Sequence, residues 1–239
     1  MKNMNTESET TELSVVDPSM SLVEAVSKRR SVRGFLDKEV PQQVINRIFE
    51  IAQQSPSNCN VQPWKAYVAS GELKESLKKK MYENTTNRVS PNPDYSYTNN
   101  FENEYRTRQV ECAVALYSKM GIGREDKEGR MRAVLRNFKF FDAPHIAFIG
   151  MDPSFGTTVA VDVGMWAQTL MLTMVAFGLH SCPMGTMRNY PDLVRQAFDV
   201  EDGTKILFGI SFGYEDSALP ANETRTTRDA TSSNVVFQS

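Results

Sequence analysis

The chain has 239 residues, 40% of them hydrophobic, and its 27 basic and 29 acidic residues give a formal net charge of -2. This composition supplies enough apolar material for one sizeable core. The near balance of charge leaves no global basic field, which argues against a protein that binds nucleic acid or an anionic membrane surface. Any anion site must therefore be local.

Residues 1–20 are rich in Thr, Ser and Glu, and they lack the apolar stretch and cleavage site of a signal peptide. We expect a flexible N-terminal tail there, followed by a single domain over residues 21–239. Three cysteines, an odd number with no metal-ligand spacing, indicate free thiols in a reducing compartment. We therefore predict a cytoplasmic protein without a metal site.

The first two predicted helices flank a run of cations. A helix should begin near Ser21 and end at about Lys28, with its apolar residues turned inward at Leu22, Val23 and Val26. A second helix is predicted to begin at Pro41, because proline is favoured in the first turn, and it must end before Pro56. Between them lies the sequence KRRSVR, which places four cations in six positions.

Three short runs rich in β-branched and aromatic residues are predicted as core strands, at residues 64–70, 145–151 and 206–214. Helical patterns separate them at residues 72–82, 101–119, 127–138, 159–179 and 191–198. This order indicates a small sheet with helices on both faces, in an α/β or α+β arrangement. The most apolar stretch, residues 163–179, is too short and too interrupted to span a bilayer, so it is predicted as a helix buried on nearly all sides.

The polar stretch from Asn84 to Asn100 contains two prolines and two tyrosines and is predicted to be irregular. Within the wider segment from Tyr82 to Tyr105, such a loop could serve as a lid over a binding site, or it could be a plain surface excursion. The sequence does not decide between these two interpretations.

Several catalytic classes lack their motifs. The chain has no G-x-G-x-x-G, no Walker A loop, no H-E-x-x-H and no G-x-S-x-G. Its two histidines, His145 and His180, each adjoin an apolar run, which favours structural histidines over a metal ligand or general base. We therefore name no catalytic side chain.

Separated stretches share a capacity to bind an anion and a polar ring. RRSVR (residues 29–33) offers guanidinium forks and a hydroxyl, the donors that suit a phosphate. SPSNCNVQPW (residues 55–64) supplies hydroxyl and amide groups that can pair with a heterocycle or merely close a turn. SCPMG (residues 181–185) follows the apolar helix, and NETRTTR (residues 222–228) adds two arginines.

Together these stretches resemble the nitroreductase family, the FMN-dependent dimeric flavoproteins. The resemblance covers about residues 20–239, with the motifs KRRSVRGF, SPSNCNVQPW, GLHSCPMG and GYEDSALPANETRTTR in the family's order. The closing segments look most like the branch that contains nitrobenzoate and nitroaromatic reductases. The resemblance implies a nitroreductase-like α+β fold, with a mainly antiparallel central sheet flanked by helices, in an intertwined homodimer with FMN at the interface.

The resemblance also implies roles for individual residues. The FMN phosphate would be bound by Arg29, Arg30, Ser31, Arg228 and, less directly, Arg225. The ribityl chain and ring would be lined by Pro56, Ser57, Asn58 and Asn60. Backbone groups near flavin N5 and O4 would come from Pro183, Met184 and Gly185, and Arg33 would lie toward the N1/O2 side. Cys59 and Cys182 would lie near the flavin as packing residues.

The function that the resemblance implies is NAD(P)H-dependent reduction of nitroaromatic or related acceptors, with electrons transferred in pairs by a ping-pong mechanism. NADH and NADPH are both open as donors. The alternatives are a flavoprotein of the same fold that reduces quinones, flavins, activated alkenes or halogenated phenols, and a non-catalytic flavin-binding protein.

Overall fold

The computed structural model describes residues 16–97, 100–200 and 203–238, and most of the predicted tail, residues 1–15, lies outside this range. In the described part, four strands form one antiparallel sheet in the order β1-β2-β4-β3. The strands are β1 (Trp64–Ser70), β2 (His145–Met151), β3 (His180–Met184) and β4 (Lys205–Gly213). The three predicted strands are confirmed to within one residue.

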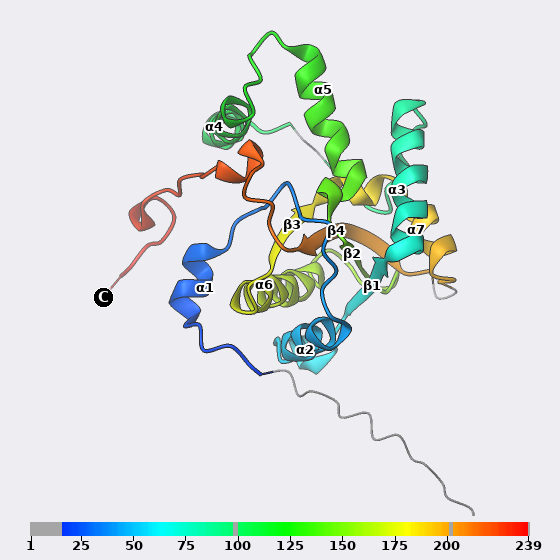
Figure 1. The fold of residues 1–239 in the computed structure, drawn as a ribbon. Coiled ribbons are helices and arrows are strands. Elements are labelled where there is room, and N and C mark those ends of the chain that lie inside the picture. Colours follow the sequence, from blue (N-terminus) through cyan, green and yellow to red (C-terminus); the bar gives the residue numbers. More distant parts are fainter. Residues whose placement is uncertain (1–15, 98–99, 201–202, 239) are drawn as a thin grey trace, which may run out of the picture.

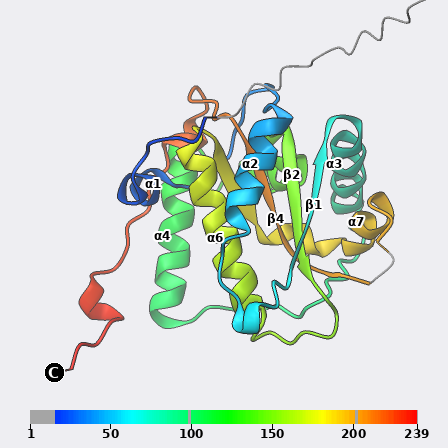
Figure 2. The ribbon, with the colours of Figure 1, turned by 90° about the horizontal axis from the view of Figure 1, so that it is seen from below.

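Helices cover both faces of this sheet, as predicted (Figures 1 and 2). The helices of the described chain are α1 (Leu22–Lys28), α2 (Gln42–Ala52), α3 (Gly71–Thr86), α4 (Asn103–Lys119), α5 (Lys127–Leu135), α6 (Ala160–Ala176) and α7 (Pro191–Ala197). The α+β class follows from the antiparallel pairing, because a parallel α/β sheet would need crossover connections. None of these helices combines the length and the apolar character needed to cross a membrane.

Two clusters of buried side chains lie on opposite faces of the central strand β2. Ile146 and Phe148 belong to the cluster packed beneath α3 and α7, whereas Ala147 and Ile149 belong to the cluster packed beneath α2 and α6. Successive strand residues point to opposite faces, so one fully buried strand serves both cores. Trp166 of α6 stacks on Trp64 with ring centroids 6.0 Å apart.

Helix α1 forms where it was predicted, but the prediction of its inward-facing residues was wrong. Ser21 caps its N-terminus by accepting a hydrogen bond from the Glu24 N–H at 3.2 Å. The predicted inward residues, however, are exposed, at 68% for Leu22, 77% for Val23 and 53% for Val26, and Ala25 is the buried residue. This short helix contacts α6 through the Ala25 side, and nothing in the described chain covers its apolar side.

Helix α6 and strand β3 also differ from prediction. An exposed stripe runs along α6 through Val161, Gly164, Met165 and Gln168, so the helix is not buried on nearly all sides. Residues 180–184 are not among the predicted strands, yet they form the edge strand β3. Pro183 is tolerated there because an edge strand needs no second ladder bond from each residue.

Candidate functional site

The structure brings two arginines from distant segments together. Arg29 follows α1, and burial together with the charge of Arg228 lowers the pKa of its guanidinium. The Arg228 guanidinium donates to the carbonyls and hydroxyl of Thr226 and Thr227. Among the described residues neither arginine has a carboxylate partner. Two neighbouring cations without a counter-charge form a binding site for a dianion such as a phosphate.

Ser31 and Cys182 lie next to each other, close to Arg29 and Arg33. Burial raises the pKa of the Cys182 thiol to about 11, although the charges of Arg33 and Arg29 and a hydrogen bond with Ser31 act in the opposite direction. The thiol is therefore protonated at neutral pH, as a packing residue would be. Ser31 forms a β-bridge with Ser181, and the Val32 N–H donates to the Ser181 carbonyl at 3.0 Å. This bridge fixes the arginine segment against β3.

Arg30 is engaged elsewhere. Its guanidinium forms an ion pair with Glu215, a half-buried residue at the end of β4. Glu215 also lies 3.6 Å from His180 Nε2. The Arg30 side chain is thus held by a carboxylate, whereas Arg29 is not. No local sequence pattern indicates this pair, because Glu215 lies 185 positions from Arg30.

Arg33 is positioned by an asparagine that the sequence interpretation did not single out. The Arg33 N–H donates to Asn222 Oδ1 at 2.7 Å, and Asn222 Nδ2 donates to the Gly34 carbonyl at 2.8 Å and the Asp216 carbonyl at 2.9 Å. Asn222 is buried, with 4% of its surface exposed. The Arg33 guanidinium donates to the Ser31 carbonyl at 3.3 Å and has no carboxylate partner in the described chain.

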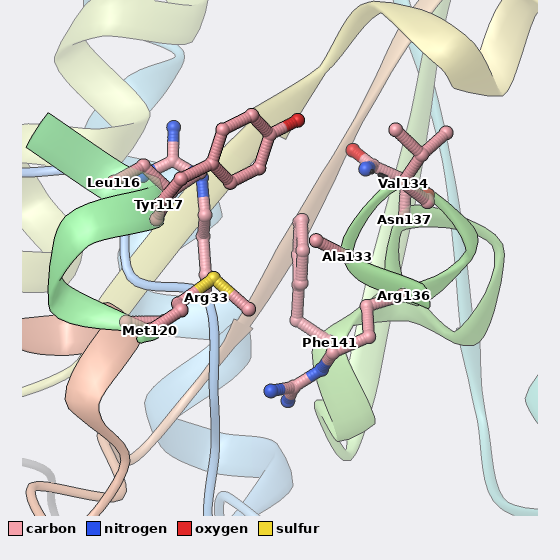
Figure 3. A pocket seen from close by; sticks show the side chains of 10 residues that line it. Arg33, Leu116, Tyr117, Met120, Ala133, Val134, Arg136, Asn137 and Phe141 are labelled. Atoms are coloured by element: carbon pink, nitrogen blue, oxygen red, sulfur yellow. Dashed lines mark hydrogen bonds between the residues drawn. The ribbon is translucent and has the colours of Figure 1, made fainter. Parts of the chain in front are cut away.

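The side chain of Arg33 borders a small cavity of about 70 Å³ (Figure 3). Tyr117 of α4 and Met120, which directly follows this helix, lie on one side of it, and Arg136 and Phe141 lie on the other. The walls are therefore largely aromatic and apolar, with two guanidinium groups. This cavity is well below the roughly 300–1,000 Å³ of typical ligand pockets, so it is not by itself a site for an aromatic ring.

The residues predicted to line the ribityl chain and ring, at positions 56–60, lie apart from the arginine segment. The segment Asn58–Asn60 forms a 3-10 turn, and the Asn58 N–H donates to Asp162 Oδ2 at 3.1 Å in the first turn of α6. The Ser57 hydroxyl accepts from the Gln62 N–H at 2.9 Å. Cys59 and Asn60 have φ values of 48° and 56°, so the turn is tightly wound. Pro56 and Asn60 are exposed.

The two groups lie at opposite ends of α6. The Asn58 turn contacts Asp162 at the N-terminal end, whereas Ser31 pairs with Ser181, five residues after the helix ends at Ala176. A 17-residue helix spans about 25 Å at 1.5 Å per residue. The two groups of one chain, called here the Arg29 half-site and the Asn58 half-site, therefore lie about one helix length apart.

The segment predicted to lie near flavin N5 and O4, residues 183–185, combines buried and exposed residues. Pro183 and Gly185 are exposed, whereas the side chain of Met184 is buried and its sulfur lies 3.6 Å from the Ser211 hydroxyl. Only the backbone of Met184 is therefore available to a ligand. The last predicted residue, Arg225, donates to the carbonyls of Asn222 at 2.8 Å and Thr224 at 3.0 Å.

The histidines have structural surroundings. His145 is 3% exposed, accepts the Val40 N–H at 3.0 Å on Nε2, and lies 2.5 Å from the Ser70 hydroxyl on Nδ1. Burial and the charge of Lys74 lower the pKa of His145 to about 4. This confirms a satisfied core histidine. Burial lowers the pKa of His180 as well, while Glu215 opposes the shift.

The candidate lid is fastened to the body of the chain. Asp94 accepts two bonds from Arg195 Nη1, at 2.9 and 3.1 Å, and one from the Ile206 N–H at 2.8 Å. The Asn92 N–H donates to the Asn189 carbonyl at 3.0 Å, and its amide donates to Asp192. The predicted irregular stretch Asn84 to Asn100 is wrong at its start, because residues 84–86 belong to α3, and residues 98–99 lie outside the described residues. The described residues from Asn87 to Tyr97 are irregular, as predicted, but anchored to the residues that follow β3.

The family model described as the nitroreductase family matches residues 26–214. The chain belongs to the nitroreductase family. Nitroreductase NfnB of Mycolicibacterium smegmatis is 34% identical over 92% of this chain and 95% of its own length. A 4-nitrobenzoate reductase of Pseudomonas putida is 32% identical over 85% of this chain and 89% of its own.

Solved nitroreductase structures have the same fold as this chain. The FMN-dependent NfnB of Mycobacterium smegmatis in complex with NADPH superposes with a TM-score of 0.86 at 32% identity, covering 92% of this chain and all of that one. A nitroreductase with bound FMN from Bacteroides fragilis, at 16% identity and a TM-score of 0.60, shares the fold. The nitroreductase fold that the sequence resemblance implied is confirmed.

Proposed function

We propose that this chain is an FMN-dependent oxidoreductase that uses NAD(P)H to reduce nitroaromatic acceptors. The observation that carries the proposal is the pairing of Arg29 with Arg228, two close cations without a carboxylate partner, beside Ser31. A phosphate at this point would satisfy them. Relatives named as FMN- and NADPH-dependent nitroreductases, and as 4-nitrobenzoate reductases, support the same conclusion.

The residues present fit the cofactor in three places. Arg29, Ser31 and Arg228 would hold the phosphate, with Arg225 nearby, while Arg30 would act indirectly because Glu215 holds its guanidinium. The ring would lie against the exposed backbone at Pro183, Met184 and Gly185, with Arg33 beside it. The Asn58 half-site would complete the FMN site with its hydroxyl and amide groups, and its residues are Pro56, Ser57, Asn58 and Asn60.

FMN, when bound, supplies two-electron chemistry by taking a hydride from NAD(P)H and passing the electrons on to a nitro group. The protein's part is to bind and orient the reactants and to stabilise charge. Fixed guanidiniums and backbone N–H groups perform these tasks without a general acid. The structural role of His145 is consistent with this division of labour.

The site requires two copies of the chain. Because the Arg29 half-site and the Asn58 half-site lie at opposite ends of α6, about 25 Å apart, one FMN would contact the first half-site of one copy and the second half-site of its partner. Large apolar residues are exposed along α4 and α6, such as Val114 at 60% and Val161 at 62%. No residue of α4 is buried. A homodimer would cover these faces.

The identity and stoichiometry of a bound chromophore test the proposal. We expect one FMN per chain in purified protein. An anaerobic titration with NADPH and NADH, followed by a panel of nitroarenes, quinones and halogenated phenols, separates the proposed activity from the alternatives of the same fold. Protein that binds FAD or no flavin would overturn the proposal, and FMN that no nicotinamide reduces would favour a non-catalytic flavin-binding protein.

We also propose that the protein works in the cytoplasm. Cys59, Cys112 and Cys182 are all free thiols, as expected of a reducing compartment. Fractionation of the source cells with an antibody to the protein tests this location.

A further inference from the structure

Arg188 lies beside the proposed flavin edge without an assigned role. It belongs to the 3-10 turn Gly185–Asn189, directly after β3. A Cβ atom placed on Gly185 would lie 3.3 Å from Arg188 Nη1 and 3.8 Å from its Cζ. The guanidinium therefore lies close beside the exposed backbone where we place the flavin ring. A glycine at position 185 permits this approach.

The candidate lid also contacts this guanidinium. Arg188 Cζ lies 3.5 Å from the centroid of the Tyr97 ring, which is a close cation–π stack. The loop that carries Tyr97 is fixed nearby through Asn92 and Asp94. Arg188 thus contacts the Tyr97 ring and lies beside Gly185, and both neighbours restrict its position.

The charge of Arg188 is not neutralised. In the described chain no carboxylate pairs with it, whereas the next arginine along, Arg195, pairs with both Asp94 and Asp192. A half-buried, uncompensated guanidinium next to a ligand site attracts an anion more strongly than an exposed one, because solvent screens it less.

We propose that Arg188 is a specificity-determining residue that favours aromatic acceptors bearing a carboxylate over their neutral counterparts. This inference rests on the proposed function, because it places the acceptor over the ring beside Gly185. The planar fork of arginine binds a carboxylate through two N–H groups while the arene lies toward the flavin. The Tyr97 ring covers part of the guanidinium.

The test measures equilibrium binding to the oxidised holoprotein, without reductant and hence without turnover. The probes are 4-nitrobenzoate and 4-nitrobenzamide, which have similar shapes and differ in charge, and the readout is the change in flavin absorbance on titration. For Arg188→Met we expect the Kd of 4-nitrobenzoate to rise about tenfold or more, since a charge-assisted contact is lost, while that of 4-nitrobenzamide changes less than about twofold.

Two further variants keep the test falsifiable if Arg188→Met folds poorly. Arg188→Lys keeps the charge but loses the fork, so it should retain only part of the preference for the carboxylate and bind it better than Arg188→Met does. Arg124→Met, at an exposed arginine far along the chain, should bind both probes as the parent does. Equal weakening of both probes in Arg188→Met, no weakening of either, or the same loss in Arg188→Lys would overturn the proposal. Parent protein without FMN would instead refute the proposed function.

Discussion

At the scale of single residues, the two arginines without carboxylate partners make the sharpest prediction. Arg29→Ala and Arg228→Ala should each weaken FMN binding by about tenfold to a hundredfold, because each removes a charge-assisted contact worth about 1.5 to 3 kcal/mol. The measurement is the FMN dissociation constant by fluorescence quenching of apoprotein titrations. Arg124→Ala serves as the control, and equal affinity in all three variants would show that the cluster is only a solvated surface.

Arg33 should act on the flavin electronically more than on its retention. Its guanidinium has no carboxylate partner in the described chain, so its charge is available to a reduced ring. A cation about 4 Å from a charge contributes about 4 kcal/mol at an effective dielectric of 20, and solvent could halve that. Since 30 mV corresponds to about 1.4 kcal/mol for a two-electron couple, Arg33→Gln should lower the midpoint potential by ~40 to 90 mV.

Spectroelectrochemistry of the FMN-bound Arg33→Gln protein checks this shift, with Arg124→Gln as its matched control. The variant should still bind FMN because Arg29 and Arg228 remain. A midpoint within about 15 mV of the parent, about half of a 1.4 kcal/mol step, would remove Arg33 from the ring.

At the scale of elements, His145 links three parts of the chain and should make their stability depend on pH. Its folded pKa is about 4, below its ordinary value near 6.5, so the neutral ring favours folding. As the pH falls from 7 to 5, the unfolded chain gains a proton that the folded chain does not, and stability is lost. The expected loss is roughly 2 kcal/mol between pH 7 and pH 5, and it grows to about 3 kcal/mol once the pH falls below 4.

Urea unfolding at pH 7 and pH 5 measures this loss, and His145→Gln isolates it. Glutamine can still accept the Val40 N–H but does not titrate, so the variant should lose about 2 kcal/mol less than the parent over this interval. The variant is itself expected to be less stable at pH 7. An identical pH dependence in the two proteins would assign the effect to other groups.

The loop at residues 92–97 should set acceptor preference through its anchors. Asp94→Ala removes the bonds to Arg195 and to the Ile206 N–H and should loosen the loop that carries Tyr97. We expect a changed ranking of nitroarene acceptors by kcat/KM with FMN affinity retained. Asn46→Ala, on the exposed face of α2, is a control, and an unchanged ranking would return the loop to a surface excursion.

Elements with strong periodicity were predictable from the sequence, and elements defined by partners were not. The buried strand His145–Met151 has an apolar residue at almost every position, which few other structures permit. Strand β3 was missed because its proline and short length are typical of a loop, and its pairing with β4 is a long-range property. The exposed side of α1 was assigned inward because periodicity identifies an apolar face but not what covers it.

The candidate site shows the same limit. The motif at residues 29–33 was found from its charge. The family resemblance then implied that its ligand is the FMN phosphate. The Arg30–Glu215 pair, the Asn222 clamp on Arg33 and the Arg188–Tyr97 stack join residues about 90 or more positions apart. No local pattern encodes such contacts, so they required the fold.

At the scale of the whole molecule, the exposed apolar faces predict association. Figures 1 and 2 show α1, α4 and α6 around one side of the sheet, with the C-terminal segment extending from the body, where Phe237 is 84% exposed. Val161→Glu, on the exposed stripe of α6, should weaken the dimer, because a charge would be buried without a partner. Light scattering across a concentration series measures the mass, and a monomeric parent would contradict the dimer.

The central claim is that each FMN is bound by opposite ends of α6 from two copies of the chain. Mixed dimers test it most directly, using one chain with Arg29→Ala and Arg228→Ala and another with Ser57→Ala and Asn58→Ala. In the mixed dimer one site combines both damaged halves and the other combines both intact halves. We predict that purified mixed dimers bind one FMN per two chains with parental affinity, while each doubly substituted homodimer binds weakly. Weak binding at every site of the mixed dimer would show that both halves act within one chain, and would contradict the claim.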